Sequence, residues 1–187
     1  LSKPYDREGR RQAEAGTHYA GDAAADVTAQ VIDSRRLIWD ALAARQAEST
    51  GPVYPVLIPT MPCFRMSRRL RAPIEVVAEH QGQWFEDTVA MVGDWRRAGP
   101  AYCLPYRSLV AANTPNLITA GRCMSAEGGA WDAVRAIPVC AATGEAAGTA
   151  AALGVADNRE SLAGLPVARL QSVLREQGVI LDPDLIA

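Results

Sequence analysis

The chain has 187 residues, of which 49% are hydrophobic and 21% are charged, and these proportions fit one globular domain or part of a larger one. Its net charge of −2 excludes the strongly basic surface of a typical nucleic-acid-binding protein. Arginines do gather at Arg68, Arg69 and Arg71. Such a cluster is more often a solvated surface with an ion pair than a phosphate-binding track.

The four cysteines are far apart, form no Cys-x-x-Cys pair and have no histidine nearby, which argues against a zinc site and against a disulfide framework. We therefore expect no metal and a reducing, cytoplasmic location. The sequence also predicts no membrane partner, because no apolar run approaches transmembrane length and no signal peptide opens the chain. The residues concerned are Cys63, Cys103, Cys123 and Cys140.

The beginning of the chain reads like the middle of a protein, since Leu1-Ser-Lys-Pro-Tyr-Asp lacks an initiator methionine. We therefore expect a fragment, whose missing upstream part could carry a targeting signal. Residues 1–25 are polar, rich in Gly and Ala and without periodicity, and are predicted to form a loop. Asp26 is a suitable N-cap for an amphipathic helix over residues 26–48, which ends before Ser-Thr-Gly-Pro.

The middle of the chain predicts strands interrupted by prolines, which belong at sheet edges or strand ends. Two helices are expected to close the chain. One begins at Pro138 and ends near Leu153, and the other has Pro166 in its first turn and ends near Gly178. The predicted strands cover residues 53–58, 67–71, 84–92 and 102–107, together with a short buried strand at 116–120.

This order of elements predicts an α+β fold derived from an α/β pattern. It has an N-terminal amphipathic helix, a proline-interrupted mixed or antiparallel sheet and two C-terminal helices. We divide the chain into an irregular segment at 1–25, a helix with a substrate-side sheet at 26–112, and a C-terminal segment at 113–187.

The start of the helix at Pro138 is the main candidate for a binding site. A helix N-terminus carries about half a positive charge from its unpaired N–H groups, so it stabilises an anion or a polarised carbonyl that faces it. Arg135 adds a full charge beside it. Small residues from Ala141 to Ala152 leave one helix face nearly bare, and close approach of another group would offset the cost of glycine there. Ordinary packing of a helix on a sheet explains the same pattern.

Two glycine features precede this helix. Gly121-Arg122 follows the predicted strand 116–120, and ligands of α/β sheets usually sit at the carboxyl ends of strands. Gly128-Gly129 would let the loop pass close to a ligand.

Three segments resemble the C-terminal part of FAD-dependent oxidoreductases of the glutathione-reductase-like superfamily. Residues 61–70 read Met-Pro-Cys-Phe-Arg-Met-Ser-Arg-Arg-Leu and are similar to a family stretch that ends in a Ser/Thr-Arg-Arg strand. Residues 104–109, Leu-Pro-Tyr-Arg-Ser-Leu, look like the family's Ile-Pro-Tyr-Arg-Ser-Leu. The third covers Asn-Leu-Ile-Thr-Ala-Gly-Arg-Cys at 116–123 and Arg-Ala-Ile-Pro-Val-Cys-Ala-Ala-Thr-Gly at 135–144, and it resembles the closing flavin-contact motif.

The resemblance implies an FAD site and a substrate site. Ala120, Gly121 and Arg122 would border the isoalloxazine ring. The helix start would face the flavin pyrimidine, where it would stabilise the negative charge of the reduced ring. The residues implied there are Arg135, Ala136, Ile137 and Pro138. A small organic substrate would be bound by Arg65, Ser67, Arg68 and Tyr106, whose guanidinium groups could hold a carboxylate.

The sequence also departs from the family pattern. Met66 stands where the family tends to have an acidic residue, and Asp132-Ala-Val stands where Gly-Ser-Ile is more usual. No Gly-x-Gly-x-x-Gly occurs, so the FAD pyrophosphate has no glycine-rich cradle. We therefore expect an incomplete flavoprotein fold whose partner is the missing N-terminal FAD-binding half, and an isolated chain that binds FAD weakly or not at all.

Two functions from different classes follow. The chain is either the C-terminal portion of an enzyme that passes a hydride between an organic substrate and FAD, or a catalytically inert interaction module derived from such an enzyme. The second alternative predicts a homo-oligomer. No residue of the chain is singled out as catalytic, and no Ser/His/Asp or Cys/His arrangement indicates a hydrolytic site.

Overall fold

The computed structural model describes residues 19–62, 64–96, 98–99 and 101–186. Contacts group the described residues into two units, 19–68 and 69–186. The first unit contains one long helix, and the second contains the sheet and the other helices. These contact units do not test the division of the sequence at residue 112.

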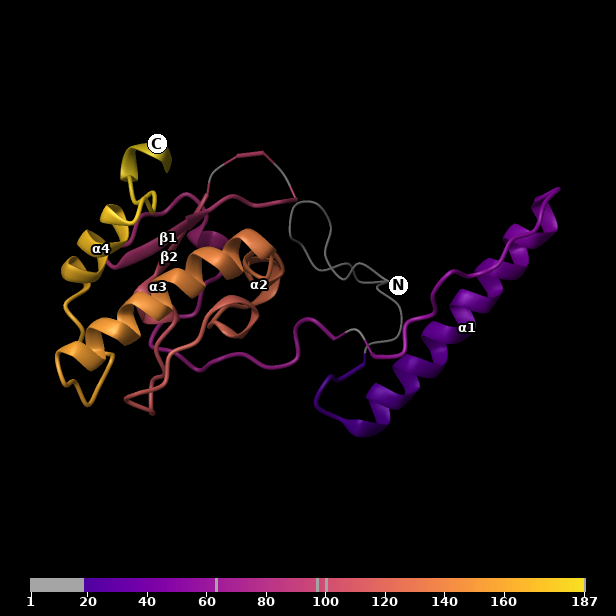
Figure 1. Ribbon diagram of the computed structural model, residues 1–187, viewed down its shortest axis with the longest axis horizontal. Helices are drawn as coiled ribbons and strands as arrows, with labels where there is room; N and C mark the ends of the chain where they lie inside the picture. The colour runs from indigo at the N-terminus through magenta and orange to yellow at the C-terminus, as the bar shows by residue number, and fades with distance from the viewer. Residues whose placement is uncertain (1–18, 63, 97, 100, 187) are drawn as a thin grey trace. The chain divides into compact units, whose positions relative to one another are not determined.

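The helix of the first unit, α1, covers Ala24–Glu48 and confirms the helix predicted for this segment (Figure 1). It begins before Asp26, so Asp26 is not the N-cap. Its carboxylate lies in the first turn instead and accepts a hydrogen bond from the Ala20 N–H at 2.8 Å. No residue of α1 is buried. An amphipathic helix is expected to bury its apolar face, and the described residues do not bury that face of α1.

The strands predicted at 53–58 and 67–71 are wrong, because both segments are irregular in the structure. Prolines at 52, 55, 59 and 62 remove the backbone N–H donors that a strand ladder needs. The apolar residues that suggested a buried strand are largely exposed. They include Tyr54, Val56 and Leu57.

The sheet of the second unit has two antiparallel strands, β1 (Thr88–Val92) and β2 (Tyr102–Pro105). Its register pairs Val92 with Tyr102 and Ala90 with Leu104, and an irregularity at Val89 shifts Thr88 opposite Pro105. Both strands are shorter than predicted. β1 begins only after a turn in which the Thr88 N–H donates to the Phe85 carbonyl, and β2 passes at residue 106 into a 3-10 turn.

The buried strand predicted at 116–120 is also wrong. Its sole ladder contact in the described structure is an isolated antiparallel bridge between Ile118 and Val110. Leu117 is 42% exposed. A strand needs a neighbour over several residues to satisfy its backbone groups, and this segment has one over a single residue pair.

Three further helices follow: α2 (Gly128–Val134), α3 (Ile137–Ala156) and α4 (Val167–Glu176). The last two confirm the predicted helices, although α3 extends beyond Leu153 and Pro166 is the N-cap of α4 rather than part of its first turn. Helix α2 was not predicted. Short 3-10 turns lie at Ala78–His80, Tyr106–Ser108, Gly121–Cys123 and Pro183–Ile186.

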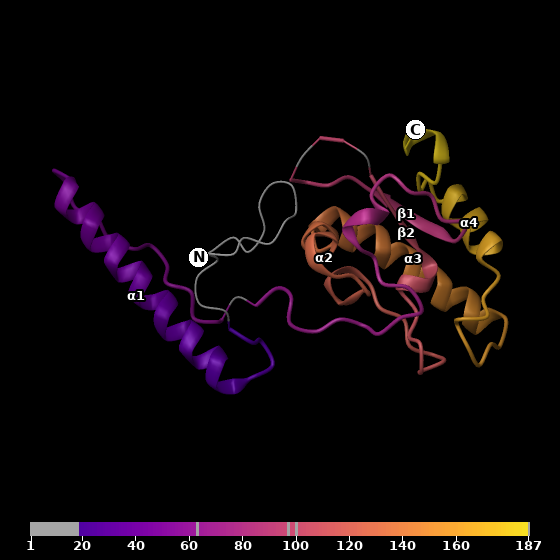
Figure 2. The same ribbon diagram turned by 180° about the vertical axis from the view of Figure 1, so that it is seen from behind.

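The core of the second unit lies between the sheet and the helices. Helix α3 runs along the sheet and packs against β1, α4 and the turn Gly121–Cys123 (Figures 1 and 2). Its buried face is made of small side chains such as Ala146 and Ala150. Mixed α+β architecture is therefore confirmed, with antiparallel strand pairing.

Helix α3 corrects one expectation from the sequence. Its 20 residues have a mean hydropathy of 1.3, which makes it the one helix of the described chain with the length and composition to cross a membrane. Core helices meet the same criterion, and a third of its apolar window is buried within the protein.

Two buried side chains connect α4 and the segment before it to the sheet. Gln171 of α4 donates from Nε2 to the carbonyls of Glu86 and Thr88, at 2.8 and 2.9 Å. Tyr106 is 1% exposed, and its hydroxyl donates to the Leu162 carbonyl at 2.8 Å. The bonds to Thr88 and Leu162 are buried and supply donors to backbone oxygens that are removed from water.

The Tyr106→Phe variant tests this connection. Loss of the hydroxyl leaves the Leu162 carbonyl unsatisfied and is expected to lower the free energy of unfolding by about 1–2 kcal/mol near neutral pH. Burial raises the pKa of Tyr106 from 10.0 to about 12, so its neutral form contributes fully below pH 10 and loses that contribution as the pH approaches 12.

Urea unfolding at about pH 8 and about pH 11 measures both effects. The stability difference between the wild type and the variant should be smaller at the higher pH. An equal difference at both pH values would contradict a buried, neutral phenol.

Candidate functional site

The N-terminus of α3 is open and carries no side-chain cap. Ala136 is the N-cap, in an extended conformation, and its carbonyl accepts the Cys140 N–H at 3.0 Å. Ile137 is 85% exposed, and Pro138 has no N–H of its own. Because helix starts leave backbone donors unpaired, this end presents a partial positive charge to its surroundings.

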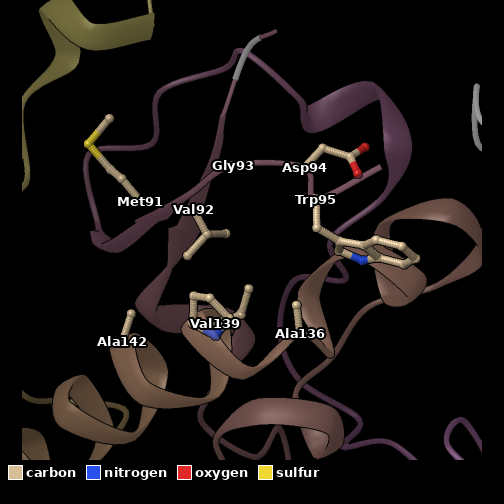
Figure 3. A pocket seen from close by; sticks show the side chains of 9 residues that line it. Met91, Val92, Gly93, Asp94, Trp95, Ala136, Val139 and Ala142 are labelled. Atoms are coloured by element: carbon tan, nitrogen blue, oxygen red, sulfur yellow. The ribbon is translucent and has the colours of Figure 1, made fainter. Parts of the chain in front are cut away.

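An open pocket of about 400 Å³ lies beside this helix start (Figure 3). One wall comes from the end of β1 and the loop after it, and the other from the first two turns of α3. Val92 and Val139 face one another across it, and the lining is mostly apolar. The lining residues are Met91, Val92, Gly93, Asp94, Trp95, Ala136, Pro138, Val139 and Ala142.

The sequence indicated the α3 wall but not the wall at 91–95. The available signal was Gly93-Asp94-Trp95, a glycine, an acid and an aromatic residue directly after a strand. Nothing in the local pattern indicates that this loop lies beside a helix that begins more than one element later.

Gly121 brings a second segment against the start of α3. Its φ is +64°, and its N–H donates to Thr143 Oγ1 at 2.9 Å. A Cβ at this position would lie 2.9 Å from the Cys140 sulfur, so only glycine allows this approach. The Gly121 backbone thus approaches the first turns of α3 closely, at Cys140 and Thr143.

Among the glycines further along α3, close packing explains Gly154, where a Cβ would lie 2.6 Å from Leu162 Cδ2, but not Gly144 or Gly148. A Cβ at Gly144 or Gly148 would have nothing within 4 Å. Gly128, in the predicted ligand loop, is also next to open space and has a φ of +53°. Close packing within the described chain thus accounts for Gly121 but not for these three positions.

The structure places Arg135 beside the helix start, as predicted, but its charge is paired. Nε of Arg135 donates to Asp132 Oδ1 at 2.8 Å, and Nη2 bonds to the same oxygen. Its guanidinium also lies 6.0 Å from the centre of the Trp95 ring. The pair is largely buried, with side-chain exposures of 18% for Arg135 and 13% for Asp132.

A second ion pair lies next to it. Arg96 donates from Nε and Nη2 to the two carboxylate oxygens of Asp94, at 2.8 and 2.7 Å. This hydrogen-bonded carboxylate raises the pKa of Arg96 above its ordinary value, against the opposing effect of burial. Nη1 of Arg96 lies 3.7 Å from Asp132 Oδ2 and is buried without a hydrogen bond. We call Asp94, Arg96, Asp132 and Arg135 the charge cluster.

The remaining residues of the predicted flavin contact lie in the turn that packs on α3. Ala120 is half-buried and precedes the turn, Gly121 is buried, and Arg122 is exposed. The indole N–H of Trp131, in α2, donates to the Arg122 carbonyl at 3.0 Å. The structure thus brings the two predicted flavin-contact segments, 120–122 and 135–138, together around the first turns of α3.

The predicted substrate residues are divided between the two units. Arg65, Ser67 and Arg68 are exposed residues of the first unit. Tyr106 belongs to the second unit, where its hydroxyl donates a hydrogen bond to the Leu162 carbonyl. A substrate-binding role for these four residues stays a prediction.

Arg69 has the structural role that was the alternative expectation for the arginine cluster. Its guanidinium forms an ion pair with Glu75 and lies 3.4 Å from a carboxylate oxygen of Glu127. It also lies 5.3 Å from the centre of the Trp131 ring. Among the described residues, no group of three or more His, Cys, Asp or Glu side chains is arranged to hold a metal ion.

The volume of this open pocket lies within the range of about 300–1,000 Å³ found for small-molecule sites, and an uncapped helix start favours a negatively charged group in front of it. The family model described as FAD dependent oxidoreductase matches residues 3–174. The chain therefore belongs to the FAD-dependent oxidoreductase family. No curated protein and no solved structure matches the sequence.

The Gly121→Ala variant tests the contact that holds the turn on α3. It is expected to destabilise the protein by about 2–3 kcal/mol, because strain at positive φ adds to a clash with the Cys140 sulfur. Gly128→Ala is the matched control, since it has a positive φ but open space, and it should cost only about 1 kcal/mol.

Combining Gly121→Ala with Cys140→Ala removes the sulfur and should recover part of the difference from the Gly128→Ala control. Chemical denaturation of the wild type, the two glycine variants and the double variant measures these free energies of unfolding. Equal costs for the two glycine variants would mean that the close approach at Gly121 does not matter.

Proposed function

We propose that this chain forms the isoalloxazine-facing part of the flavin site of an FAD-dependent oxidoreductase, which transfers a hydride between a small organic substrate and FAD. The observation that carries the proposal is the uncapped start of α3 beside an apolar pocket, in a chain that belongs to this family. Ala136, Ile137 and Pro138 would face the flavin, with Ala120, Gly121 and Arg122 as the adjoining contact.

The chemistry of the pocket fits such a ring. Small-molecule sites measure about 300–1,000 Å³ and are mostly apolar, and this pocket has about 400 Å³ with valines on both walls. Trp95 offers an aromatic surface on one wall. Flavin supplies the hydride chemistry when bound, whereas the residues of this chain would bind and orient the ring. The positive end of α3 would favour the negative charge that the ring acquires on reduction.

The pyrophosphate of FAD requires a further site. Backbone N–H groups of a glycine-rich turn usually cradle it, and the sequence contains no Gly-x-Gly. We propose that residues outside these 187, in an N-terminal FAD-binding half, bind the pyrophosphate and the adenosine. FAD should then bind to the chain alone about as weakly as a flavin without adenosine.

The predicted cytoplasmic location, without a membrane partner, remains part of the proposal. Among the described cysteines, Cys103, Cys123 and Cys140 are free thiols, which agrees with a reducing compartment. The predicted substrate residues Arg65, Ser67, Arg68 and Tyr106 also belong to the proposal, on the strength of the family resemblance.

A second candidate function, an inert interaction module, is favoured by the apolar surface of the first unit. Ile32 and Trp39 of α1 are about half exposed, and large side chains after the helix are more exposed still. Such surfaces commonly mark interaction sites. The further residues are Leu37, Tyr54, Val56, Leu57 and Met61. Sedimentation equilibrium separates the alternatives, because the module predicts a stable homo-oligomer with no flavin affinity.

Flavin titration tests the proposed function. Quenching of flavin fluorescence should give dissociation constants for riboflavin, FMN and FAD that agree within about three-fold, because all three would share one ring site and have no pyrophosphate cradle. The Ala142→Phe variant fills the pocket and should weaken binding at least about ten-fold. Ala152→Phe, at an exposed position of the same helix, is the control.

Two results would count against this account. FAD that co-purifies stoichiometrically with the chain, or that binds far more tightly than FMN, would refute the missing pyrophosphate site. Absence of binding by all three flavins, or equal binding by the Ala142→Phe variant, would refute the ring site.

A further inference from the structure

The charge cluster joins the two walls of the pocket. Asp94 and Trp95 belong to the wall that follows β1. Asp132 and Arg135 lie at the end of α2, immediately before Ala136 and the α3 wall. Figure 3 shows Asp94 and Trp95 on the opposite side of the pocket from Ala136 and Val139. Contacts between these two segments therefore fix the distance between the walls.

The polar contacts between these segments converge on the end of α2, and most of them on Asp132. Its carboxylate lies 3.7 Å from Nη1 of Arg96, and its backbone carbonyl accepts the Trp95 indole N–H at 3.1 Å. The same carboxylate holds Arg135, which lies against the Trp95 ring. Asp132 thus touches both arginines of the cluster and the aromatic side chain of the opposite wall.

The cluster is largely removed from water. Its side-chain exposures are 1% for Asp94, 8% for Arg96, 13% for Asp132 and 18% for Arg135. A buried ion pair contributes little net stability while complete, but loss of one partner leaves a charge that neither water nor protein compensates. Removal of the Asp132 charge would therefore leave the Arg135 guanidinium uncompensated, while Arg96 keeps its pair with Asp94.

The cluster also sets the charge next to the start of α3. Among the described residues of the cluster, two carboxylates balance two guanidinium groups, so Arg135 adds no net positive charge beside the helix start. A ligand in the pocket would then meet the partial charge of the helix end and not a free guanidinium. This differs from the role that the resemblance implies for Arg135.

We propose that Asp132 is a positioning residue that clasps the two walls of the pocket through Arg96, Arg135 and Trp95, and that shields the ligand from the charge of Arg135. The clasp stands on the contacts alone. The shielding rests on the proposed flavin site, because it concerns the charge state of the bound ring.

Hydrogen exchange tests the clasp without any ligand. Asp132→Asn removes the charge, Asp132→Glu retains it, and Glu160→Gln removes an equal charge from an exposed position beyond the other end of the 20-residue helix α3. NMR spectroscopy on the nitrogen-15-labelled chain follows the Trp95 indole N–H and the Nε–H groups of the two arginines.

In the Asp132→Asn protein, exchange of the Arg135 Nε–H should accelerate at least about ten-fold, because its carboxylate acceptor is lost. The Trp95 indole N–H keeps its backbone acceptor, so its exchange should accelerate only through separation of the two segments. The Arg96 Nε–H donates to Asp94, so its exchange rate should change much less and serves as an internal reference. Asp132→Glu should restore much of the protection, and Glu160→Gln should have no effect. An unchanged exchange rate of the Trp95 indole N–H in the Asp132→Asn protein would overturn the clasp.

The affinities for reduced and oxidised FMN test the shielding. In Asp132→Asn the ratio of the two affinities should rise about five-fold in favour of reduced FMN, because the Arg135 charge is no longer compensated. The ratio should be unchanged in Glu160→Gln and close to wild type in Asp132→Glu. An unchanged ratio in an Asp132→Asn protein that still binds FMN would overturn the shielding alone. No FMN binding by the wild type would overturn the proposed function and the shielding with it, whereas the exchange rates still decide the clasp.

Discussion

The close contact between the Gly121 backbone and the first turns of α3 is the constraint on which the site depends. The absence of a side chain at residue 121 lets its N–H reach Thr143 and its Cα approach Cys140. On its buried side, α3 packs against β1, whose end forms the other wall of the pocket. The helix start is therefore held from two directions while its backbone donors remain uncapped. An anion site needs this combination, because preorganised donors lose less free energy on binding than mobile ones.

Electrostatics gives the site a second constraint. Arg135 would attract an anion strongly if its charge were free, but Asp132 neutralises it within a largely buried pair. The pocket thus relies on a helix terminus, whose effect is weaker and directional. Buried ion pairs are poor sources of stability, so their value here lies in fixing the geometry of two segments that are 37 positions apart at Trp95 and Asp132. Binding and positioning are separable roles, the first belonging to α3 and the second to the cluster.

The sequence predicted the features that depend on local chemistry. Helical periodicity and a following turn predicted α1, and prolines near the first turn predicted α3 and α4. The motif at 120–122 and 135–138 indicated the start of α3. The strand at 116–120 failed because a strand depends on a neighbour that the local pattern does not specify. The strand at 53–58 failed because its prolines, which the sequence shows, remove backbone donors. Helix α2 escaped detection because it has only seven residues and begins with two glycines. The wall at 91–95 and the pairing of Arg135 depend on tertiary contacts, although Asp132 at three positions before Arg135 was visible as a departure from the family pattern.

The central claim is that the pocket at the start of α3 binds a flavin ring. Chemical-shift mapping of backbone amides during a titration with FMN tests it most directly, because the spectrum reports which residues respond without assuming a site. The account predicts that the largest changes occur at Gly93, Trp95, Ala136 and Val139, on the two walls of the pocket. Amides on α4 and in the first unit should remain nearly unchanged. Changes concentrated away from the pocket, or no changes at FMN concentrations of about 1 mM, the limit of weak specific binding, would contradict the claim.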